Sequence, residues 1–484
     1  MIAQRPKSKT GSAPYILHAR KQADDRGLCV KMPDETMSHA GPLDSKPLDI
    51  AIVGSGISGL SAAWLLSRRH RITLFEADDR IGGHSHTVDA GDVPVDTGFI
   101  VYNEKTYPNL TALFAHLDVP TRPTEMTLGI SLDRGRLEYS GTGFGGLFAQ
   151  KRNLLRPRFW SMLRDIVRFY RRAPRDLATL GDESLGAYLD RGRYGAAFRD
   201  DHLYPMAAAI WSTPAADIPA YPAAAFIRFC QNHGLLELGE RPLWRTVDGG
   251  SRAYVKRLTA SFAEHIVTGQ PVRAIHRFPG WVEIESGTDE RARFDHVVIA
   301  THADQALRLL ADADADERAI LGAFGYRANE AVLHSDASLM PRRRAVWSSW
   351  NYASEAGDAA SVLSVTYWMN RLQGIADSHP LFVTLNPIRA PDPALVIRSD
   401  LYEHPVFDTA AGAAQAKLWS LQGVRNSWFC GAYFGAGFHE DGLQAGLAVA
   451  EQLGGVRRPW RVADESGRIA IGTAAAPDRG RIAA

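Results

Sequence analysis

The chain has 484 residues and a formal net charge of +1, with 45% hydrophobic and 23% charged residues. This balance is typical of a globular enzyme of two ordinary domains, and it excludes a fibrous or disordered chain and a global field that attracts nucleic acid. The three cysteines, Cys29, Cys230 and Cys430, form no CxxC pair, which excludes a cysteine-rich zinc site or a disulfide framework and fits a reducing compartment.

Both ends of the chain are polar. Residues 1–46 have basic residues but no apolar core of a secretory signal, so we expect a disordered N-terminal extension, and we expect a disordered tail over 461–484. Met37 opens a short polar lead into the first strand, and we interpret it as the natural start; a native mass that includes residues 1–36 would contradict this. No stretch approaches the roughly 18 unbroken apolar residues of a spanning helix, which favours a cytoplasmic protein.

Between these ends, strand and helix patterns alternate along the chain. A strand at 48–53, a helix from 57 to about 69 and a strand at 71–75 form a β–turn–α–β unit. A helix at 106–117, a strand-like stretch at 125–139 broken by a turn at 133–135, and a mostly helical part from 153 to about 230 follow. The next segments are strands near 271–275 and 281–285, a strand and helix at 294–310, a strand-rich part at 331–403, and a strand, glycine-rich loop and helix at 427–453.

This recurrence predicts an α/β protein of two domains, a Rossmann-type domain with an interleaved α+β substrate domain. The Rossmann-type domain would comprise residues 47–110, 240–304 and 425–460. The substrate domain would comprise residues 111–239, mostly helical, and 305–424, which are strand-rich.

A glycine fingerprint lies in the first turn, where residues 54–59 read Gly54-Ser55-Gly56-Ile57-Ser58-Gly59, a GxGxxG. The first glycine permits the tight turn, the second lets the backbone approach a pyrophosphate at the helix N-terminus, and the third lets the helix pack on the strand. Glu76 ends the next strand, where a carboxylate accepts hydrogen bonds from ribose hydroxyls and repels a 2′-phosphate. The alternative is a chance glycine cluster, but the strand, helix and acid at this spacing predict a dinucleotide site, without separating FAD from NAD.

Further motifs resemble the amine-oxidase and phytoene-desaturase superfamily of FAD enzymes. Arg80, Gly82 and Gly83 resemble its R-x-G-G motif, which passes the FAD phosphates, and residues 96–99, with Gly98, resemble a flavin-approaching loop. Residues 428–432 and 440–446 resemble its closing motif, which implies that Gly431 approaches the ribityl chain and that the helix start at Gly442 and Leu443 faces the flavin. Val272 falls at the position of its adenine-contacting strand residue. The resemblance implies FAD as the cofactor.

A narrower resemblance covers about residues 45–460. Residues 101–121, 147–160, 205–214 and 429–446 resemble a bacterial family of predicted FAD-binding oxidoreductases that are often encoded beside cyclopropane-fatty-acid-synthase-like methyltransferases. Part of this group is associated with oxidising methylated acyl chains toward furan fatty acids. The resemblance implies an FAD-dependent oxidoreductase of fatty acid metabolism that dehydrogenates or oxidises a lipid acyl chain by hydride transfer to flavin, with such a methyltransferase as a candidate partner.

Two departures from the superfamily bear on the reaction. Typical amine oxidases hold a lysine near the flavin, but this chain has no lysine between Lys256 and Lys417, and it has Gly431-Ala432 where Gly-Asp is usual. The alternatives are therefore an amine-oxidase-like or carotenoid-desaturase-like flavoenzyme on another substrate, and a non-catalytic flavoprotein that supports a lipid methyltransferase.

Residues 151–175 form a basic and aromatic segment, with nine basic residues and one acid, Asp165. Apolar residues follow one helical face and arginines flank it; the face comprises Phe159, Leu163, Ile166 and Tyr170, joined by Trp160 and Val167. Such a helix can lie on an anionic membrane, on the inner face of the cytoplasmic membrane for this protein. The alternative is an ordinary helix that packs on its own domain. No nucleic-acid motif accompanies the segment.

The sequence names no catalytic residue and no metal cluster. His439 or Glu440 could act as a base, with a structural histidine and a helix-capping acid as the alternatives, and Tyr433 and Phe434 are expected near the flavin edge. His84 and His86 are expected to bind phosphate or backbone. Five aromatic residues are candidates for a substrate pocket, with core packing as the default: Trp347, Trp350, Tyr352, Tyr367 and Trp368.

Overall fold

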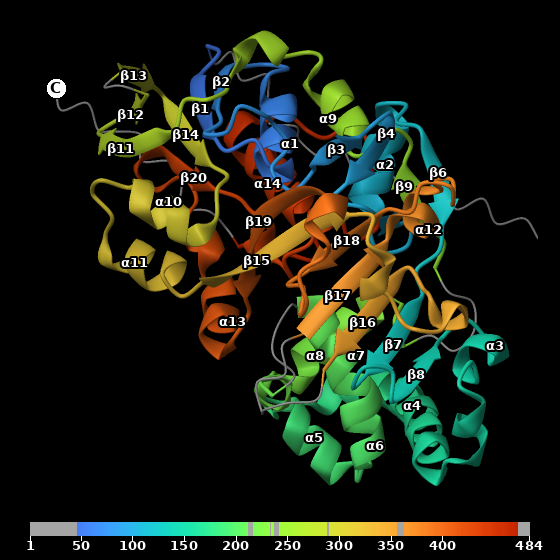
Figure 1. Cartoon of the computed structure of the whole chain (residues 1–484). Coiled ribbons are helices and arrows are strands. Elements are labelled where there is room, and N and C mark those ends of the chain that lie inside the picture. Colours follow the sequence, from blue (N-terminus) through green and yellow to red (C-terminus); the bar gives the residue numbers. More distant parts are fainter. Residues whose placement is uncertain are drawn as a thin grey trace, which may run out of the picture. The chain divides into compact units, whose positions relative to one another are not determined.

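The computed structural model describes residues 46–211, 216–232, 234–236, 242–287, 290–355 and 363–472 (Figure 1). Met37, Cys29 and the predicted N-terminal extension up to residue 45 lie outside these residues, as does the end of the tail from 473. Within the described ranges, no helix combines the length and the hydrophobicity that crossing a bilayer requires.

A five-stranded parallel sheet confirms the predicted Rossmann-type fold. Its strand order is β10-β2-β1-β14-β20, with β1 (Asp49–Val53), β2 (Arg71–Phe75), β10 (Ile266–Val267), β14 (His296–Ile299) and β20 (Ser427–Phe429). The neighbours all pair in parallel, and the β1 residues Ile50, Ala51 and Ile52 are fully buried, as expected for a sheet covered on both faces. The strands come from distant parts of the chain, so the interleaving is also confirmed; the domain boundaries given above stay a prediction.

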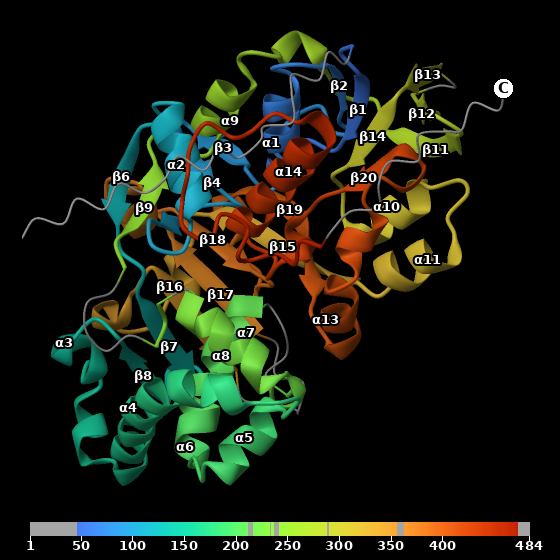
Figure 2. The ribbon, with the colours of Figure 1, turned by 180° about the vertical axis from the view of Figure 1, so that it is seen from behind.

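Two helices cross this sheet in close contact. α1 (Ile57–Leu66) is buried along its whole length and packs on α14 (His439–Gly454), which Figure 2 shows from behind. The contact is close because α14 carries Gly446 at the crossing, where a Cβ atom would lie 2.2 Å from the carbonyl oxygen of Ser58. α2 (Pro108–His116) and α9 (Arg252–Thr259) lie beside these helices.

A seven-stranded sheet forms the second part of the fold. Its order is β19-β15-β18-β17-β16-β7-β8, with β7 (Leu128–Leu132), β8 (Leu137–Ser140), β15 (Gly325–His334), β16 (Trp350–Ser354), β17 (Leu363–Trp368), β18 (Phe382–Leu385) and β19 (Val396–Val406). All pairs are antiparallel except β7 with β16. One face packs against a helical layer, in which α7 (Tyr204–Trp211) contacts β16 and β17 and lies beside α8 (Ala223–Asn232) (Figure 2).

Smaller elements complete the fold. The strands are β3 (Thr87–Ala90), β4 (Val93–Asp96), β5 (Tyr102–Asn103), β6 (Thr121–Thr124), β9 (Trp244–Val247), β11 (Val272–Phe278), β12 (Trp281–Ser286) and β13 (Glu290–Phe294). The helices are α3 (Phe144–Leu147), α4 (Pro157–Asp176), α5 (Leu185–Arg191), α6 (Ala196–Phe198), α10 (Ala303–Leu309), α11 (Ala315–Leu321), α12 (Met369–Gln373) and α13 (Thr409–Gln415).

The apolar face of α4 packs on its own domain, which was the alternative to membrane contact. Phe159, Met162 and Phe169 are at most 2% exposed in the cluster beneath the helical layer, and Leu163, Ile166 and Tyr170 pack against it. Of the face predicted from the sequence, Trp160 and Val167 are exposed, at 49% and 37%.

Residues 461–472 differ from the expected disordered tail. The Arg468 guanidinium donates to Asp441 Oδ1 over 2.6 Å and to the carbonyl oxygen of Thr106 over 2.8 Å, and Ile469 is buried. Just before this segment, Trp460 stacks on Trp64 at 5.7 Å. The prediction of disorder from polar composition was wrong for these residues because a polar segment can become ordered through buried charge pairs as well as through burial of apolar side chains.

The five candidate pocket aromatics divide between two faces of the seven-stranded sheet, because side chains alternate along a strand. Trp350 and Tyr367 pair across β16 and β17 at 5.7 Å, and Tyr352 is buried in the cluster on the helical side. Trp347 and Trp368 pack with Phe382 in a separate cluster. They therefore do not line one common pocket.

Candidate functional site

The glycine fingerprint lies at the carboxyl ends of the parallel strands, where ligands of such sheets bind. Gly54 follows β1 with a φ of +100°, and its N–H donates to the carbonyl oxygen of Phe75 at the end of β2. A Cβ atom on Gly59 would lie 1.9 Å from the carbonyl oxygen of Gly54, so the first turn of α1 can pack on the strand end only with glycine there.

The N-terminus of α1 is open. Gly56 stands at its N-cap, no side chain caps it, and no atom lies within 4 Å of the position that a Cβ atom on Gly56 would take. The second glycine pair lies against this turn, because the N–H of Gly82 donates to the carbonyl oxygen of Ser55 over 3.1 Å and a Cβ atom on Gly83 would lie 3.1 Å from the Gly56 Cα atom. Free N–H groups beside a surface lined by glycines fit a diphosphate.

Arg80 and Glu76 lie on either side of this surface. Arg80 Nη1 donates to the carbonyl oxygen of Gly83 over 2.9 Å. The Glu76 carboxylate accepts from the N–H of Ser55 at 2.9 Å and from that of Asp78 at 3.0 Å, so it is held at the end of β2 while remaining partly exposed. Val272 opens β11, two residues after Gln270, whose N–H donates to the Glu76 carbonyl oxygen over 3.2 Å.

The closing motif, residues 428–432 and 440–446, also packs against the fingerprint turn. A Cβ atom on Gly442 would lie 2.8 Å from Ser58 Oγ and 3.6 Å from the N atom of Ala432, the residue after Gly431. Leu443 is fully buried. Gly98 lies against His84, since the next N–H, that of Phe99, donates to the His84 carbonyl oxygen over 2.7 Å. The structure therefore brings the glycine turns at residues 54–59 and 82–83 together with the start of α14.

His439 and Glu440 are held by hydrogen bonds. His439 Nε2 lies 2.6 Å from the Tyr254 hydroxyl, and its ring stacks on Phe99 at 3.9 Å. Burial lowers the pKa of His439 to about 3, so it is a neutral acceptor at pH 7 and a weak base. Glu440 is buried and accepts four hydrogen bonds, from Asn109 N and Nδ2, Leu110 N and Gln444 Nε2. Glu440 thus caps α2, which is the structural role given as its alternative.

The other candidates from the sequence lie in the core or bind side chains. Tyr433 and Phe434 are at most 3% exposed in the main core, and the Tyr433 hydroxyl has no hydrogen-bond partner among the described residues. His86 Nδ1 lies 2.9 Å from the Tyr402 hydroxyl instead of binding backbone, and burial lowers its pKa to about 4.

Three imidazoles that lie far apart in the sequence meet beside Gly83. The ring of His84 lies 6.4 Å from that of His302, at the start of α10, and 5.5 Å from that of His404, on β19. Burial lowers the pKa of all three, to about 4 for His404, and repulsion from neighbouring imidazoles lowers the pKa of His84 and His404 further, so the three rings are neutral at pH 7. The sequence reasoning missed His302 and His404; the one available signal was that His302 follows a parallel strand at its carboxyl end. In the described ranges no group of three His, Cys, Asp or Glu residues is suited to hold a metal.

A parallel sheet with a glycine turn, an open helix N-terminus and an acid at the end of the second strand defines a dinucleotide-binding fold. The chain belongs to the family of flavin-containing amine oxidoreductases, whose profile matches residues 57–454. Membership of this family implies FAD as the cofactor, and the glycine-lined surface at the N-terminus of α1 fits the diphosphate of FAD.

Individual proteins support this assignment. A protein of Mycobacterium tuberculosis named as a flavin-containing monoamine oxidase, AofH, is 28% identical over 261 residues, which are 52% of this chain and 56% of that protein. The chain thus matches little more than half the length of this relative. Among solved structures, a mutant of putrescine oxidase has a TM-score of 0.62 at 16% identity, covering 84% of this chain and 98% of that one. A fatty acid isomerase of P. acnes that produces CLA has a TM-score of 0.61 at 18% identity over the same shares. These two likenesses concern the fold.

Proposed function

We propose that this oxidoreductase dehydrogenates or oxidises a lipid acyl chain. The observation that carries the proposal is the loop before α14, which joins the closing motif beside the fingerprint turn to the apolar cluster beneath the helical layer. Ala436 and Phe438 of this loop pack against that cluster, and the Phe438 ring lies 5.0 Å from Phe229 of α8. A substrate that reaches the flavin from this side would contact apolar and aromatic side chains.

The cofactor would lie across the N-terminus of α1, with its ends at Glu76 and α14. The residues proposed to hold it are Gly54, Ser55, Gly56, Ile57, Ser58, Gly59, Glu76, Arg80, Gly82, Gly83, Gly98, Val272, Gly431, Gly442 and Leu443. When bound, FAD supplies the acceptor for a hydride from a substrate carbon. The N-terminus of α14 would place a positive dipole end toward the cofactor, while the chain itself would exclude water and orient the substrate.

The face of the seven-stranded sheet that carries Trp350 and Tyr367 is the proposed substrate wall. Leu128 of β7 is the neighbour of Trp350 in register, and both Leu128 and Tyr367 are only partly buried against the apolar cluster. Partly buried apolar side chains beside a cofactor site are typical of pockets that bind apolar ligands.

An amine substrate is the second candidate, because AofH and putrescine oxidase are named for amines. The absence of any lysine between Lys256 and Lys417 argues against the usual amine-oxidase arrangement. A flavoprotein without turnover that supports a methyltransferase is the third reading, and a cyclopropane-synthase-like methyltransferase remains the proposed partner under either lipid reading.

Anaerobic mixing tests these readings. Oxidised enzyme is mixed with a methylated phospholipid, with a free methylated fatty acid and with putrescine, and loss of flavin absorbance is followed. Bleaching by a lipid supports the proposal, and bleaching by the amine alone overturns it. No bleaching, together with stable binding of a methyltransferase, would favour the scaffold. Trp350→Leu should lower the rate with lipid several-fold, whereas Trp368→Leu, on the other face of the same sheet, serves as the matched control for lost stability.

We also propose that the enzyme docks on an anionic membrane through the tip formed by α3, the following 3₁₀ helix (Lys151–Leu155) and the start of α4. Large apolar side chains are exposed there: Phe144 (84%), Leu154 (48%), Leu155 (87%) and Trp160 (49%). Lys151, Arg152 and Arg158 are exposed beside them. Exposed apolar side chains surrounded by basic residues favour insertion into the headgroup region of an anionic membrane, and each basic residue contributes about 1 kcal/mol to the binding free energy.

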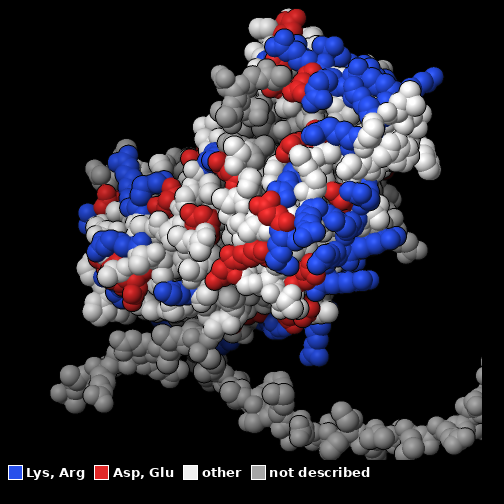
Figure 3. Space-filling view, turned by 90° about the horizontal axis from the view of Figure 1, so that it is seen from below, with Lys and Arg blue, Asp and Glu red and all other residues white. Residues whose placement is uncertain are grey.

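The outer side of α4 extends this basic surface. A shallow groove of about 520 Å³ is lined by Arg164, Val167, Arg168, Arg171, Arg172, Arg175 and Asp176. Lys and Arg side chains gather on this side of the molecule in the view from below (Figure 3). Cosedimentation with vesicles of phosphatidylserine and of phosphatidylcholine tests the docking. Phe144→Ser with Leu155→Ser should reduce binding to the anionic vesicles about tenfold or more, and Leu401→Ser, at a leucine of β19 that is 69% exposed, should not.

A further inference from the structure

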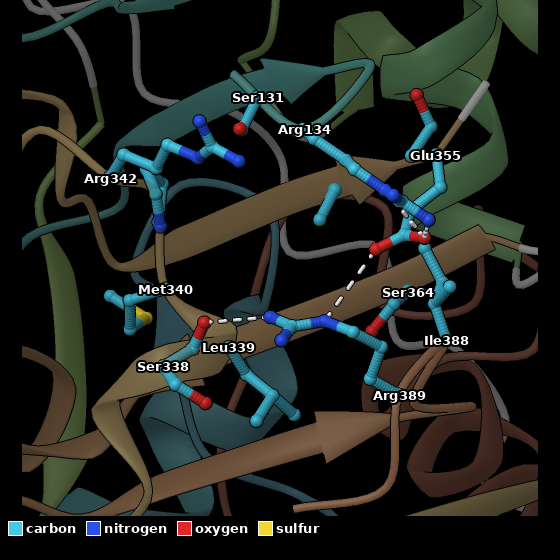
Figure 4. Close-up of a pocket in the computed structure, with 13 residues that line it drawn as sticks. Ser131, Arg134, Ser338, Leu339, Met340, Arg342, Glu355, Ser364, Ile388 and Arg389 are labelled. Carbon is cyan, nitrogen blue, oxygen red and sulfur yellow. Dashed lines mark hydrogen bonds and ion pairs between the residues drawn. The ribbon is translucent and has the colours of Figure 1, made fainter.

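A cavity of about 510 Å³ opens on the face of the seven-stranded sheet opposite the helical layer (Figure 4). Its floor is made by Ser131, Ala353 and Ser364, which are direct neighbours in register on β7, β16 and β17. These side chains are small, so the sheet is hollow here, and two of them carry hydroxyl groups.

The walls of the cavity are strongly basic. Arg134 comes from the turn between β7 and β8, Arg342 from the segment after the 3₁₀ helix Ala337–Leu339, and Arg389 from the segment after β18. Glu355 is the acidic residue of the lining; it lies 2.6 Å from Arg134 Nη2 and 3.5 Å from Arg389 Nε. Three guanidinium groups against one carboxylate leave two positive charges in excess.

Arg342 is the group that this arrangement leaves without a counter-charge. Its backbone N–H donates to Glu138, but its guanidinium has no hydrogen bond or ion pair within the described part of the chain, and Figure 4 shows it pointing into the cavity. Arg389 Nη2 donates to the Ser338 carbonyl oxygen over 2.9 Å, which fixes that side chain across the cavity. The remaining wall is apolar, with Leu339, Met340 and Ile388.

We propose that this cavity binds the dianionic phosphate group of a small organic phosphate monoester. The two excess positive charges match a dianion, and guanidinium groups bind phosphate oxygens in pairs. The Ser364 hydroxyl of the floor can donate to the remaining oxygen, whereas the Ser131 hydroxyl already donates to Glu138 Oε1. The volume exceeds that of inorganic phosphate, and the apolar wall would contact the organic part. The site lies on the opposite face of the sheet from Trp350 and Tyr367, so it is separate from the proposed substrate wall and does not rest on the proposed function.

Calorimetric titration of the full-length holoenzyme tests the site with glycerol 3-phosphate, inorganic phosphate, a short-chain lysophosphatidate and uncharged glycerol. We expect glycerol 3-phosphate to bind more tightly than inorganic phosphate and glycerol not to bind. Tighter binding of the lysophosphatidate would identify a lipid headgroup as the source, and equal binding a soluble metabolite. Affinity should fall several-fold from pH 8 to pH 5.5, where the monoester loses its second charge.

Variants locate the binding. Arg342→Gln and Arg389→Gln should each weaken it about tenfold or more, because each removes a charged hydrogen-bond donor, whereas Arg291→Gln, on β13, should leave it unchanged. Melting temperatures within 2 °C of the wild type would show that the variants fold. The proposal would be overturned if neither glycerol 3-phosphate nor inorganic phosphate binds. It would also be overturned if all three variants lose affinity equally, or if neither cavity variant loses affinity.

Discussion

Two alanine substitutions in the glycine fingerprint distinguish a glycine that contacts the cofactor from a glycine that the fold requires. A methyl group on Gly56 would meet no protein atom within 4 Å, and the residue has φ −65° and ψ 175°, which any amino acid adopts. Gly56→Ala should therefore change the free energy of unfolding of the apoprotein by about 1 kcal/mol or less, the difference between glycine and alanine at a helix N-cap. Gly59→Ala should disrupt the fold itself, because its methyl group would lie 1.9 Å from the Gly54 carbonyl oxygen.

If the diphosphate lies against Gly56, the same methyl group occupies its place. Overpacking costs about 1–3 kcal/mol, which corresponds to roughly 5- to 150-fold weaker FAD binding. Fluorescence titration of deflavinated protein with FAD measures the affinity, and urea denaturation of the apoprotein measures stability. A Gly56→Ala protein that binds FAD as tightly as the wild type would refute the assignment of this turn to the diphosphate.

Three further substitutions test the buried polar groups. Burial lowers the pKa of His202 from 6.5 to about 4. Between these pH values the unfolded chain binds more protons than the folded protein, so the free energy of unfolding falls as the pH drops, by about 2 kcal/mol at pH 5. His202→Gln should remove this part of the pH dependence, measured by urea denaturation. Glu440→Gln should cost about 1–3 kcal/mol, since an amide cannot accept all four hydrogen bonds, and the exposed Glu264→Gln should cost almost nothing in the same assay. Arg468→Gln should cost about 3 kcal/mol because it leaves the buried Asp441 carboxylate unpaired; a loss under 0.5 kcal/mol would contradict the pairing.

The parts of the site that the sequence predicts are those coded by contiguous residues. Residues 54–59, with the strand before them and Glu76 after the next strand, specify the turn, the helix start and the acid within one short unit. Four of the five strands of the parallel sheet follow from such apolar runs, whereas the two-residue β10 has no signal in the sequence. For these parts of the fold, the local sequence pattern is therefore sufficient for the prediction, without knowledge of which distant segments pair.

Other features depend on long-range pairing and leave no local signal. His302 and His404 meet His84 only because β14 and β19 are brought beside the glycine loop, and Tyr254 likewise meets His439, which lies 185 residues further along the chain. The amphipathic pattern of α4 is the same for a membrane and for a protein core, so periodicity could not distinguish them. The tail from 461 is polar throughout, and only the position of Asp441 reveals that Arg468 is needed in the interior.

The order of the strands has a consequence for how the enzyme is made. The middle strand β1 is flanked by β14, and β20 completes the sheet with residues from the last sixth of the chain. A ribosome must therefore release nearly the whole polypeptide before the edge of the sheet and α14 can be added. Until then the fingerprint turn has no partner helix, and nascent chains would expose the apolar surface of α1 to chaperones. Flavin capture is thus expected to be a post-translational event, sensitive to the supply of FAD at the moment of release.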